Sequence, residues 1–409
     1  MKKLFVCILL ILALPYISLA AILVPNTNVH HDSCRLSSGL VVVAYGDYIN
    51  LRSGYPSVVA GTGSGASISW GTPLVLDAVN PCAQIRITAF NTDLPNPTAC
   101  VTYSWYGVGF NEIWVQMISV DPATLNITAG VAQYVGWSIS NVHGYYKDVV
   151  RISNTKGAVV FGNSYGCAPG YAVETALRGC GFDVDANPGR TISNIPQLNG
   201  DACPTLIHNI FPFCIRVAVL DAASSKIVMS YRDNALTTDQ YVTACTVQAN
   251  NTLTVGAPVE VQNDAVNKYL TDIVSTEVDK FAVYYEDADV SPHNTYTKIG
   301  TAAGLVITIQ PTSVLVLSGE APCAVEMYED LLVHSTDESI GSVSVGAASV
   351  SDLNRGYLNP GVANGHLTVC AFDSSRPNNF TFLYFYTNQF PDNNLHYGLL
   401  LYSWQPTIH

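Results

Sequence analysis

Short apolar runs, rather than a helical periodicity, dominate the pattern of this chain. Runs rich in Val, Ile, Thr and Tyr are interrupted by Gly, Asn, Asp or Pro roughly every eight to twelve residues. This pattern is typical of β-sandwiches, barrels and propellers, and 409 residues are too many for a single sandwich. We therefore predict an all-β protein built from a repeated unit.

One motif recurs along the chain. An apolar or β-branched run is followed by an aromatic residue, one further residue, and then Asp or Asn, most clearly in 40–47. A continuous apolar run fits a strand that is buried on both faces, and the closing Asp or Asn suits a turn. The copies are centred on Tyr45, Tyr103, Phe161, Tyr231, Tyr285, Ser335 and Tyr386, of which those at Tyr103 and Ser335 are degenerate.

The spacing of the motif predicts the architecture. Successive copies lie 58, 58, 70, 54, 50 and 51 residues apart, and a unit of about fifty residues accommodates the four short strands of one propeller blade. Over residues 21–409 the chain resembles seven-bladed β-propeller repeat proteins in general, although it lacks the signature residues of WD, kelch and sialidase-like repeats. The resemblance implies one seven-bladed domain, and the 70-residue interval indicates an insertion at about 164–215.

Two similar segments are candidates for outer strands of blades. Residues 70–76 and 255–261 both contain Gly-x-Pro followed by apolar residues, and Pro suits an edge strand. No such segment follows the last copy of the motif. The apolar residues Ile22, Leu23 and Val24 are candidates to replace it, either in the last blade of their own chain or, as a donated strand, in a neighbouring copy.

The first twenty residues predict a secretory signal peptide. Lys2 and Lys3 precede an apolar run at 4–14, and Ser18-Leu19-Ala20 forms a cleavage signal. The apolar run is too short to cross a bilayer comfortably, and no later stretch of eighteen apolar residues occurs. We therefore expect a secreted, extracellular or cell-surface chain that begins at Ala21 and has no membrane span.

The cysteine content also supports export to an oxidising compartment. Ten of the 11 cysteines remain after the signal peptide, and the chain has no Cys-x-x-Cys pair. An even number in an oxidising compartment favours disulfides over metal binding. We predict local pairs within Cys167/Cys180 and Cys203/Cys214. The other candidates, whose pairing stays open, are Cys34, Cys82, Cys100, Cys245, Cys323 and Cys370; four of them precede a blade motif, so links between the first strands of adjacent blades are one option.

The net charge and the N-glycosylation sequons indicate which partners suit the surface of the protein. The chain has 18 basic and 31 acidic residues, so nucleic acids and anionic membranes are poor partners. Charged residues are only 12% of the chain, against 48% hydrophobic residues. Either most strands are buried on both faces, or partners or sugar cover part of the surface. Three sequons fit the second explanation and predict N-glycosylation at Asn126, Asn250 and Asn379.

Catalytic signals are weak. Propeller glycosidases place two or three acids around their axis, and Asp47, Asp233, Asp287 and Asp337 recur at the end of the motif. Recurrence at one place in several repeats favours a role in turns instead. The chain contains no nucleophile elbow, phosphate loop or zinc-protease motif. We therefore expect no catalytic residue, no metal site and no cofactor.

These observations favour a non-catalytic extracellular glycoprotein module. It would be structural or would bind ligands, as a subunit of a surface assembly or filament, with other copies of itself or extracellular proteins or glycans as partners. Two alternatives remain open. One is a carbohydrate-active propeller enzyme, either a glycoside hydrolase or a lyase, and the other is a soluble lectin.

Overall fold

The computed structural model describes the greater part of the chain. The described residues are 21–24, 27–50, 53–64, 67–105, 111–138, 147–163, 175–196, 204–210, 212–233, 239–262, 271–287, 294–318, 323–328, 331–335, 340–345, 350–354, 367–376, 379–387 and 395–403. Within these ranges every helical or extended element is a strand, which confirms the all-β prediction. In the same ranges we find no helix with the length and apolar character needed to cross a membrane. The predicted signal peptide at 1–20 lies outside the described residues.

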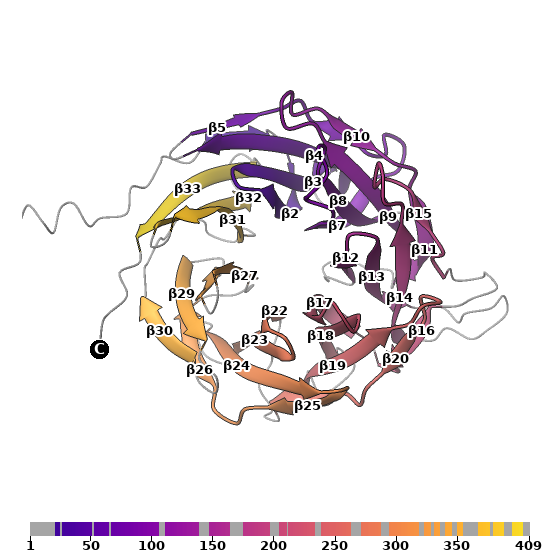
Figure 1. Ribbon diagram of the computed structural model, residues 1–409, viewed down its shortest axis with the longest axis vertical. Helices are drawn as coiled ribbons and strands as arrows, with labels where there is room; N and C mark the ends of the chain where they lie inside the picture. Colours follow the sequence, from indigo (N-terminus) through magenta and orange to yellow (C-terminus); the bar gives the residue numbers. More distant parts are fainter. Residues whose placement is uncertain are drawn as a thin grey trace, which may run out of the picture.

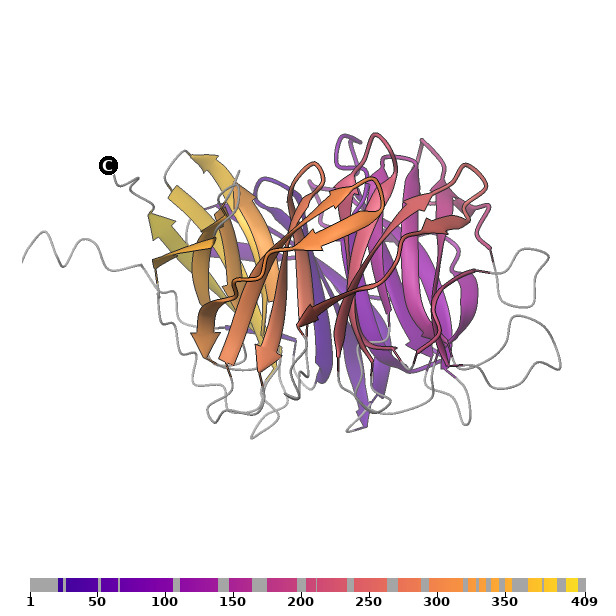
Figure 2. The same ribbon diagram turned by 90° about the horizontal axis from the view of Figure 1, so that it is seen from below.

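Consecutive antiparallel meanders are arranged as blades around a common axis, so the fold is a β-propeller (Figure 1). The first strand of each blade lies nearest the axis, and in the edge-on view the strands run across the thickness of the ring (Figure 2). The first strands are β2 (Thr27–Ser37), β7 (Cys82–Ala89), β12 (Lys147–Ser153), β17 (Pro212–Asp221), β22 (Thr271–Glu277), β27 (Cys323–Tyr328) and β31 (Leu367–Arg376).

The recurring motif forms the second strand of each blade. In β3, Val41, Val42 and Val43 are all fully buried, because blades pack against both faces of this strand. The prediction of burial on both faces is therefore confirmed. The second strands are β3 (Leu40–Asn50), β8 (Thr98–Trp105), β13 (Lys156–Asn163), β18 (Lys226–Asp233), β23 (Lys280–Asp287), β28 (Leu331–Ser335) and β32 (Asn379–Thr387).

The third strands pair with the second strands along most of their length. They are β4 (Ser53–Ser64), β9 (Asn111–Val120), β14 (Ala176–Val184), β19 (Gln240–Val247), β24 (Asn294–Ala303), β29 (Ile340–Val345) and β33 (Leu395–Ser403). Isolated pairs, Gly54 with Cys82 and Ser138 with Asn163, join the first three blades into one continuous sheet.

Most outer strands consist of two short pieces. The two-piece outer strands are β5 (Ser67–Trp70) with β6 (Leu74–Val75), β10 (Ile127–Ala129) with β11 (Gln133–Ser138), β15 (Ile192–Ser193) with β16 (Thr205–His208), β20 (Leu253–Val255) with β21 (Val259–Gln262), and β25 (Val306–Ile309) with β26 (Val314–Ser318). One further outer strand, β30 (Val350–Asn354), is a single piece. The interval predicted as an insertion, about 164–215, thus contains three regular strands of the third blade, β14, β15 and β16.

The two Gly-x-Pro segments lie where an outer strand is broken, which confirms that they belong to outer strands. The Gly71 N–H donates to the Ala60 carbonyl at 2.8 Å, and the Gly256 N–H donates to the Ala244 carbonyl at 2.9 Å. A Cβ atom at Gly71 would lie only 2.7 Å from Leu125 of the next blade. Glycine at this position therefore permits the close approach of adjacent blades.

The N-terminal strand completes the last blade within its own chain. Strand β1 (Ala21–Val24) pairs antiparallel with β33, with Ala21 opposite Tyr397 and Val24 opposite Leu395. The Leu23 side chain packs against a cluster that contains buried Val41 and Val43 of the first blade. The N-terminal strand therefore also packs where the last blade meets the first.

The apolar core lies between neighbouring blades rather than at the centre of the ring. Val42 of the first blade and Ile85 of the second share one cluster, and Phe161 of the third blade packs with Ile113 of the second. Because apolar side chains fill the spaces between blades, the strands at the axis can carry polar side chains.

Candidate functional site

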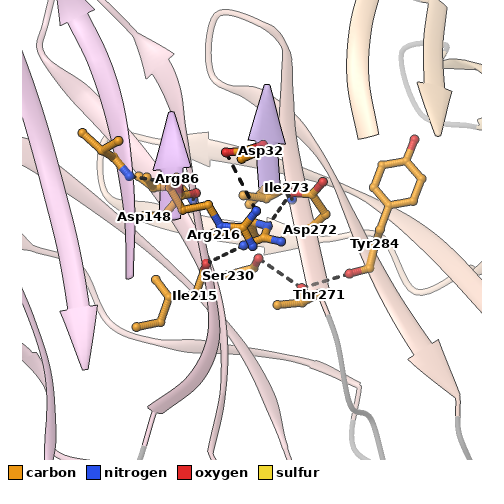
Figure 3. A network of polar contacts seen from close by, with 12 residues as sticks. Asp32, Arg86, Asp148, Ile215, Arg216, Ser230, Thr271, Asp272, Ile273 and Tyr284 are labelled. Carbon is orange, nitrogen blue, oxygen red and sulfur yellow. Dashed lines mark hydrogen bonds and ion pairs between the residues drawn. The ribbon is translucent and has the colours of Figure 1, made fainter. Parts of the chain in front are cut away.

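Five charged residues line the axis, on the first strands of five consecutive blades. Each occupies the same register position, opposite the residue that directly precedes the motif aromatic in the second strand. The pairs are Asp32 with Ala44, Arg86 with Thr102, Asp148 with Val160, Arg216 with Ser230, and Asp272 with Tyr284. Acidic and basic residues alternate, and we call these five residues the axial ring (Figure 3).

The aspartates of the axial ring bind backbone N–H groups. Each accepts a hydrogen bond on one oxygen from the residue that follows it: Ser33 donates to Asp32 at 2.9 Å, Val149 to Asp148 at 2.9 Å, and Ile273 to Asp272 at 2.8 Å. This contact fixes the side-chain rotamer, because the donor belongs to the same strand.

Two of these aspartates also link adjacent blades. Asp32 Oδ2 accepts from the Ile87 N–H of the second blade at 3.0 Å, and Asp148 Oδ2 accepts from the Val217 N–H of the fourth blade at 2.9 Å. Both donors follow the axial-ring arginine of their own strand. Each carboxylate thus satisfies an inner-strand N–H at a blade junction, where an unpaired buried donor would be costly.

The arginines form ion pairs with two of the aspartates. Arg86 Nη1 lies 3.8 Å from Asp32 Oδ2, and Arg216 Nε lies 3.5 Å from Asp272 Oδ1. The Asp32 side chain is 18% exposed, whereas the side chains of Arg86, Arg216 and Asp272 are between 6% and 11% exposed. These charges are largely removed from water, so their interactions are stronger than those of surface ion pairs.

Asp148 is the central acid of the axial ring. Burial raises the pKa of its carboxyl to about 6, because desolvation outweighs the nearby positive charges of Arg216 and Arg86. The negative charge of Asp32 adds to the increase. A carboxyl with this pKa can act as a general acid or base near neutral pH.

A buried amine precedes Asp148 in the chain. Lys147 is 1% exposed, and its Nζ donates to Ser104 Oγ of the second blade at 2.9 Å. Burial lowers the pKa of this amine to about 7. Side chains alternate along a strand, so Lys147 reaches back to the second blade while Asp148 bonds forward to the fourth.

Between the fourth and fifth blades, neutral side chains form a hydrogen-bond network at the register position that Lys147 occupies in the third blade. Thr271 Oγ1 donates to the Tyr284 carbonyl at 2.9 Å and lies 3.1 Å from Ser230 Oγ (Figure 3). Gln240 Nε2 donates to Thr271 Oγ1 and, at 3.3 Å, to the same Tyr284 carbonyl. Thr271 occupies the same register position as Lys147, since each lies opposite a motif aromatic.

The acids singled out from the sequence lie elsewhere. Asp47, Asp233 and Asp287 are at or near the ends of second strands, away from the register position of the axial ring, and Asp337 lies outside the described residues. The Asp233 N–H donates to the Asp239 carbonyl at 2.9 Å. This contact is made by the backbone of Asp233, so the turn role of these acids stays a prediction.

Sequence reasoning missed the axial-ring acids, although the sequence contains a signal for them. Asp32, Asp148 and Asp272 each lie thirteen residues before a motif aromatic, namely Tyr45, Phe161 and Tyr285. A fixed offset of this kind places the three acids at one register position once the strand hairpin is known.

The predicted cysteine pairs stay predictions. Cys167 and Cys203 lie outside the described residues, so neither local pair is described in full. Cys34, Cys82, Cys323 and Cys370 do lie on first strands, as does Cys214. In the structure Cys82, Cys100, Cys180 and Cys245 are buried thiols, and burial raises the pKa of Cys82 and Cys245 to about 12.

The predicted glycosylation sites also stay predictions. Asn126 and Asn250 are exposed, and each lies in a turn between a third strand and an outer strand. Asn379 is the first residue of β32, and its side chain lies outside the described residues. In the described part of the chain no group of three His, Cys, Asp or Glu side chains could hold a metal ion.

Comparison with known proteins identifies the fold and no sequence family. No family model matches the chain, and no curated protein matches it in sequence. Among solved structures, an α-L-arabinanase from Penicillium chrysogenum in complex with arabinobiose superposes with a TM-score of 0.53 at 9% identity, over 94% of this chain and 98% of that one. A mutant α-L-arabinofuranosidase from Fusarium graminearum with an iminosugar inhibitor has a TM-score of 0.51 at 10% identity, over 94% and 97% of the two chains.

These similarities correct one expectation. The sequence favoured a non-catalytic structural or binding module, because its recurring acids belong to turns. Both solved structures, however, are carbohydrate-active propeller enzymes. The sequence argument also overlooked the three acids at the axis, Asp32, Asp148 and Asp272.

Proposed function

We propose that this chain is a carbohydrate-active propeller enzyme that acts on glycosidic bonds at the axial ring. The observation that carries the proposal is Asp148, a carboxyl whose pKa burial raises to about 6 and which lies two blades away from each of the other axial-ring acids, Asp32 and Asp272. Glycoside hydrolysis needs two carboxyl groups in different protonation states, and different environments are the means by which proteins create that difference.

Each axial-ring acid has a distinct role in this proposal. Asp148 in its protonated form donates a proton to the oxygen of the leaving group, while its remaining lone pairs keep the backbone hydrogen bonds from Val149 and Val217. Asp32 or Asp272, each ion-paired with an arginine, supplies the second, anionic carboxylate. That carboxylate acts either on a water molecule or directly on the sugar.

The solved structures support a choice of substrates for the first test. They are an arabinanase with arabinobiose and an arabinofuranosidase with an iminosugar. Linear arabinan and aryl α-L-arabinofuranosides therefore come first, followed by a panel of other soluble polysaccharides and aryl glycosides.

The test is the release of reducing sugar or aryl alcohol by the full chain across pH 4–8. We expect kcat to fall as the pH rises through about 6, because Asp148 must be protonated. Asp148→Asn should lower kcat by about 10²- to 10⁴-fold. The matched control is Asp221→Asn, because Asp221 ends β17 and binds the exposed turn residues Ala223 and Ser224. Lack of turnover on the whole panel, or full activity of Asp148→Asn, would overturn the proposal.

The same proposal includes a finer description of the fold and of the chain's destination. We propose seven blades, supported by the first strands β2, β7, β12, β17, β22, β27 and β31 in the described ranges, with the last blade completed by β1. We also propose export through the signal at 1–20, which would place the enzyme outside the cell, where polymeric glycans are found.

A further inference from the structure

The three sequons lie on one face of the ring. We call the turn face the face on which the first strand of each blade turns into the second, at residues 38–39, 90–97, 154–155, 222–225 and 278–279. Third strands run parallel to first strands within a blade, so they end on the same face. Asn126 and Asn250 follow the ends of third strands β9 and β19. Asn379 opens second strand β32 and lies opposite Arg376, the last residue of β31.

The turn that carries Asn126 is held by hydrogen bonds at its base and exposed at its tip. The Asp121 N–H donates to the Asn126 carbonyl at 3.0 Å, and Asp121 Oδ1 accepts from the Ala123 N–H at 2.9 Å. Leu125 adopts a φ of 60° and is buried beneath Gly71 of the first blade. The neighbouring residue thus anchors the backbone while the Asn126 side chain stays exposed.

The turn that carries Asn250 has the same design. Asn251 adopts a φ of 65° and is fully buried, where its Nδ2 donates to the Asn194 carbonyl at 2.8 Å and its Oδ1 accepts from Lys156 Nζ at 2.6 Å. Asn250 itself is exposed, and its Oδ1 accepts from Thr252 Oγ1 at 2.7 Å. Both turns therefore bury one residue between adjacent blades and expose the neighbouring sequon asparagine.

The opposite face has asparagines but no sequon of its own. Asn209 is exposed directly after β16, next to the start of first strand β17, and it is followed by Ile210 and Phe211 instead of a hydroxyl residue. The chain contains no sequon besides those at Asn126, Asn250 and Asn379, once Asn96 is excluded by Pro97. All possible attachment points thus belong to the turn face.

We infer that N-linked oligosaccharides at Asn126, Asn250 and Asn379 cover the turn face and leave the opposite face without attached sugar. In the modification, each Nδ2 forms a bond to the anomeric carbon of an oligosaccharide. The bond from that carbon to a lipid pyrophosphate breaks, and the amide proton is lost. The donor is thus a lipid-pyrophosphate-linked oligosaccharide, and the inference depends on the fold, not on the proposed reaction.

The experiment begins with the full chain secreted from a eukaryotic host. Glycopeptide mass spectrometry should find sugar at Asn126, Asn250 and Asn379, and Asn126→Gln and Asn250→Gln should each remove one glycan from the intact mass. Concanavalin A bound to the native protein, seen edge-on by electron microscopy, should add density to one face only.

A gain-of-site variant provides the matched control. Phe211→Thr creates a sequon at Asn209, so it should add one glycan and place lectin density on both faces. Unmodified Asn126 and Asn250 in folded, secreted protein, or lectin on both faces of the unaltered protein, would overturn the inference. Hydrolysis is not measured in this experiment, so its outcome is independent of the proposed enzymatic activity.

Discussion

First and second strands of the same blade are stabilised in different ways. In the third blade, second strand β13 buries Val159, Val160 and Phe161 against both neighbouring blades. First strand β12, its hairpin partner, carries buried Lys147 and the axial-ring acid Asp148, whose polar atoms reach adjacent blades. Adjacent blades are thus joined by apolar packing away from the axis and by directed polar contacts at the axis.

The difference follows from the number of neighbours that each strand has. A second strand pairs on both edges and packs on both faces, so apolar side chains suit almost all its positions. A first strand has an unpaired edge toward the axis, where backbone N–H groups such as those of Ile87 and Val217 need acceptors. Asp32 and Asp148 provide them from the preceding blade. Charge at the axis therefore has a structural task as well as the proposed chemical one.

The largest effect on stability should come from a second strand. Phe161→Ala removes a fully buried ring from the cluster between the second and third blades, and should lower the free energy of unfolding by about 3–5 kcal/mol. Chemical denaturation followed by tryptophan fluorescence would measure this loss. Val131→Ala, at a side chain that is 75% exposed, should change stability by less than about 0.5 kcal/mol. Equal effects of the two variants would contradict the packing that we describe.

An axial-ring variant should have a smaller effect on stability. Asp148→Asn preserves the size of the side chain, but the new amide group cannot accept both N–H bonds, so one donor at the junction with β17 or within β12 loses its partner. The expected loss is about 1–3 kcal/mol. A larger loss than that of Phe161→Ala would reverse the ranking of the two strand types.

The pH dependence separates this variant from a simple packing defect. The pKa of Asp148 is about 6 in the folded chain and near 4 in an unfolded one, so the folded state holds more protons between those values. Stability from this group is therefore fully present below pH 4 and is lost as the pH rises through 6. Asp148→Asn lacks this titration, so its deficit relative to the unaltered protein should be greater at pH 4 than at pH 7, whereas the deficit of Phe161→Ala should show no such trend.

The same contrast explains what the sequence revealed about the fold. The second strands were predictable because burial on both faces demands an unbroken apolar run, as at Val41, Val42 and Val43. The segments 70–76 and 255–261 were predictable as outer strands, because Pro suits an edge strand. The position of the N-terminal strand was predictable only as one of two options, since its pairing with β33 is set by tertiary structure.

The candidate site was not predicted, for a physical reason. Asp32, Asp148 and Asp272 are far apart in sequence, and only the ring closure of the blades brings them to one axis. A single Asp in a short first strand resembles an ordinary edge residue. Their constant offset from Tyr45, Phe161 and Tyr285 was present in the sequence. Only the register of the strand hairpins shows that this offset places the three acids at equivalent positions.

The smallest effect should come from the strand that completes the last blade. Leu23 is only partly buried against the cluster of Val41 and Val43, so Leu23→Ala should lower the free energy of unfolding by about 1 kcal/mol. Hydrogen exchange should then increase in β33, whose outer edge depends on β1, while β13 on the far side of the ring keeps its protection. If exchange rose equally in β13, the N-terminal strand would stabilise the ring as a whole. A local increase would instead show that the outer strands protect single blades, whereas the second strands hold neighbouring blades together.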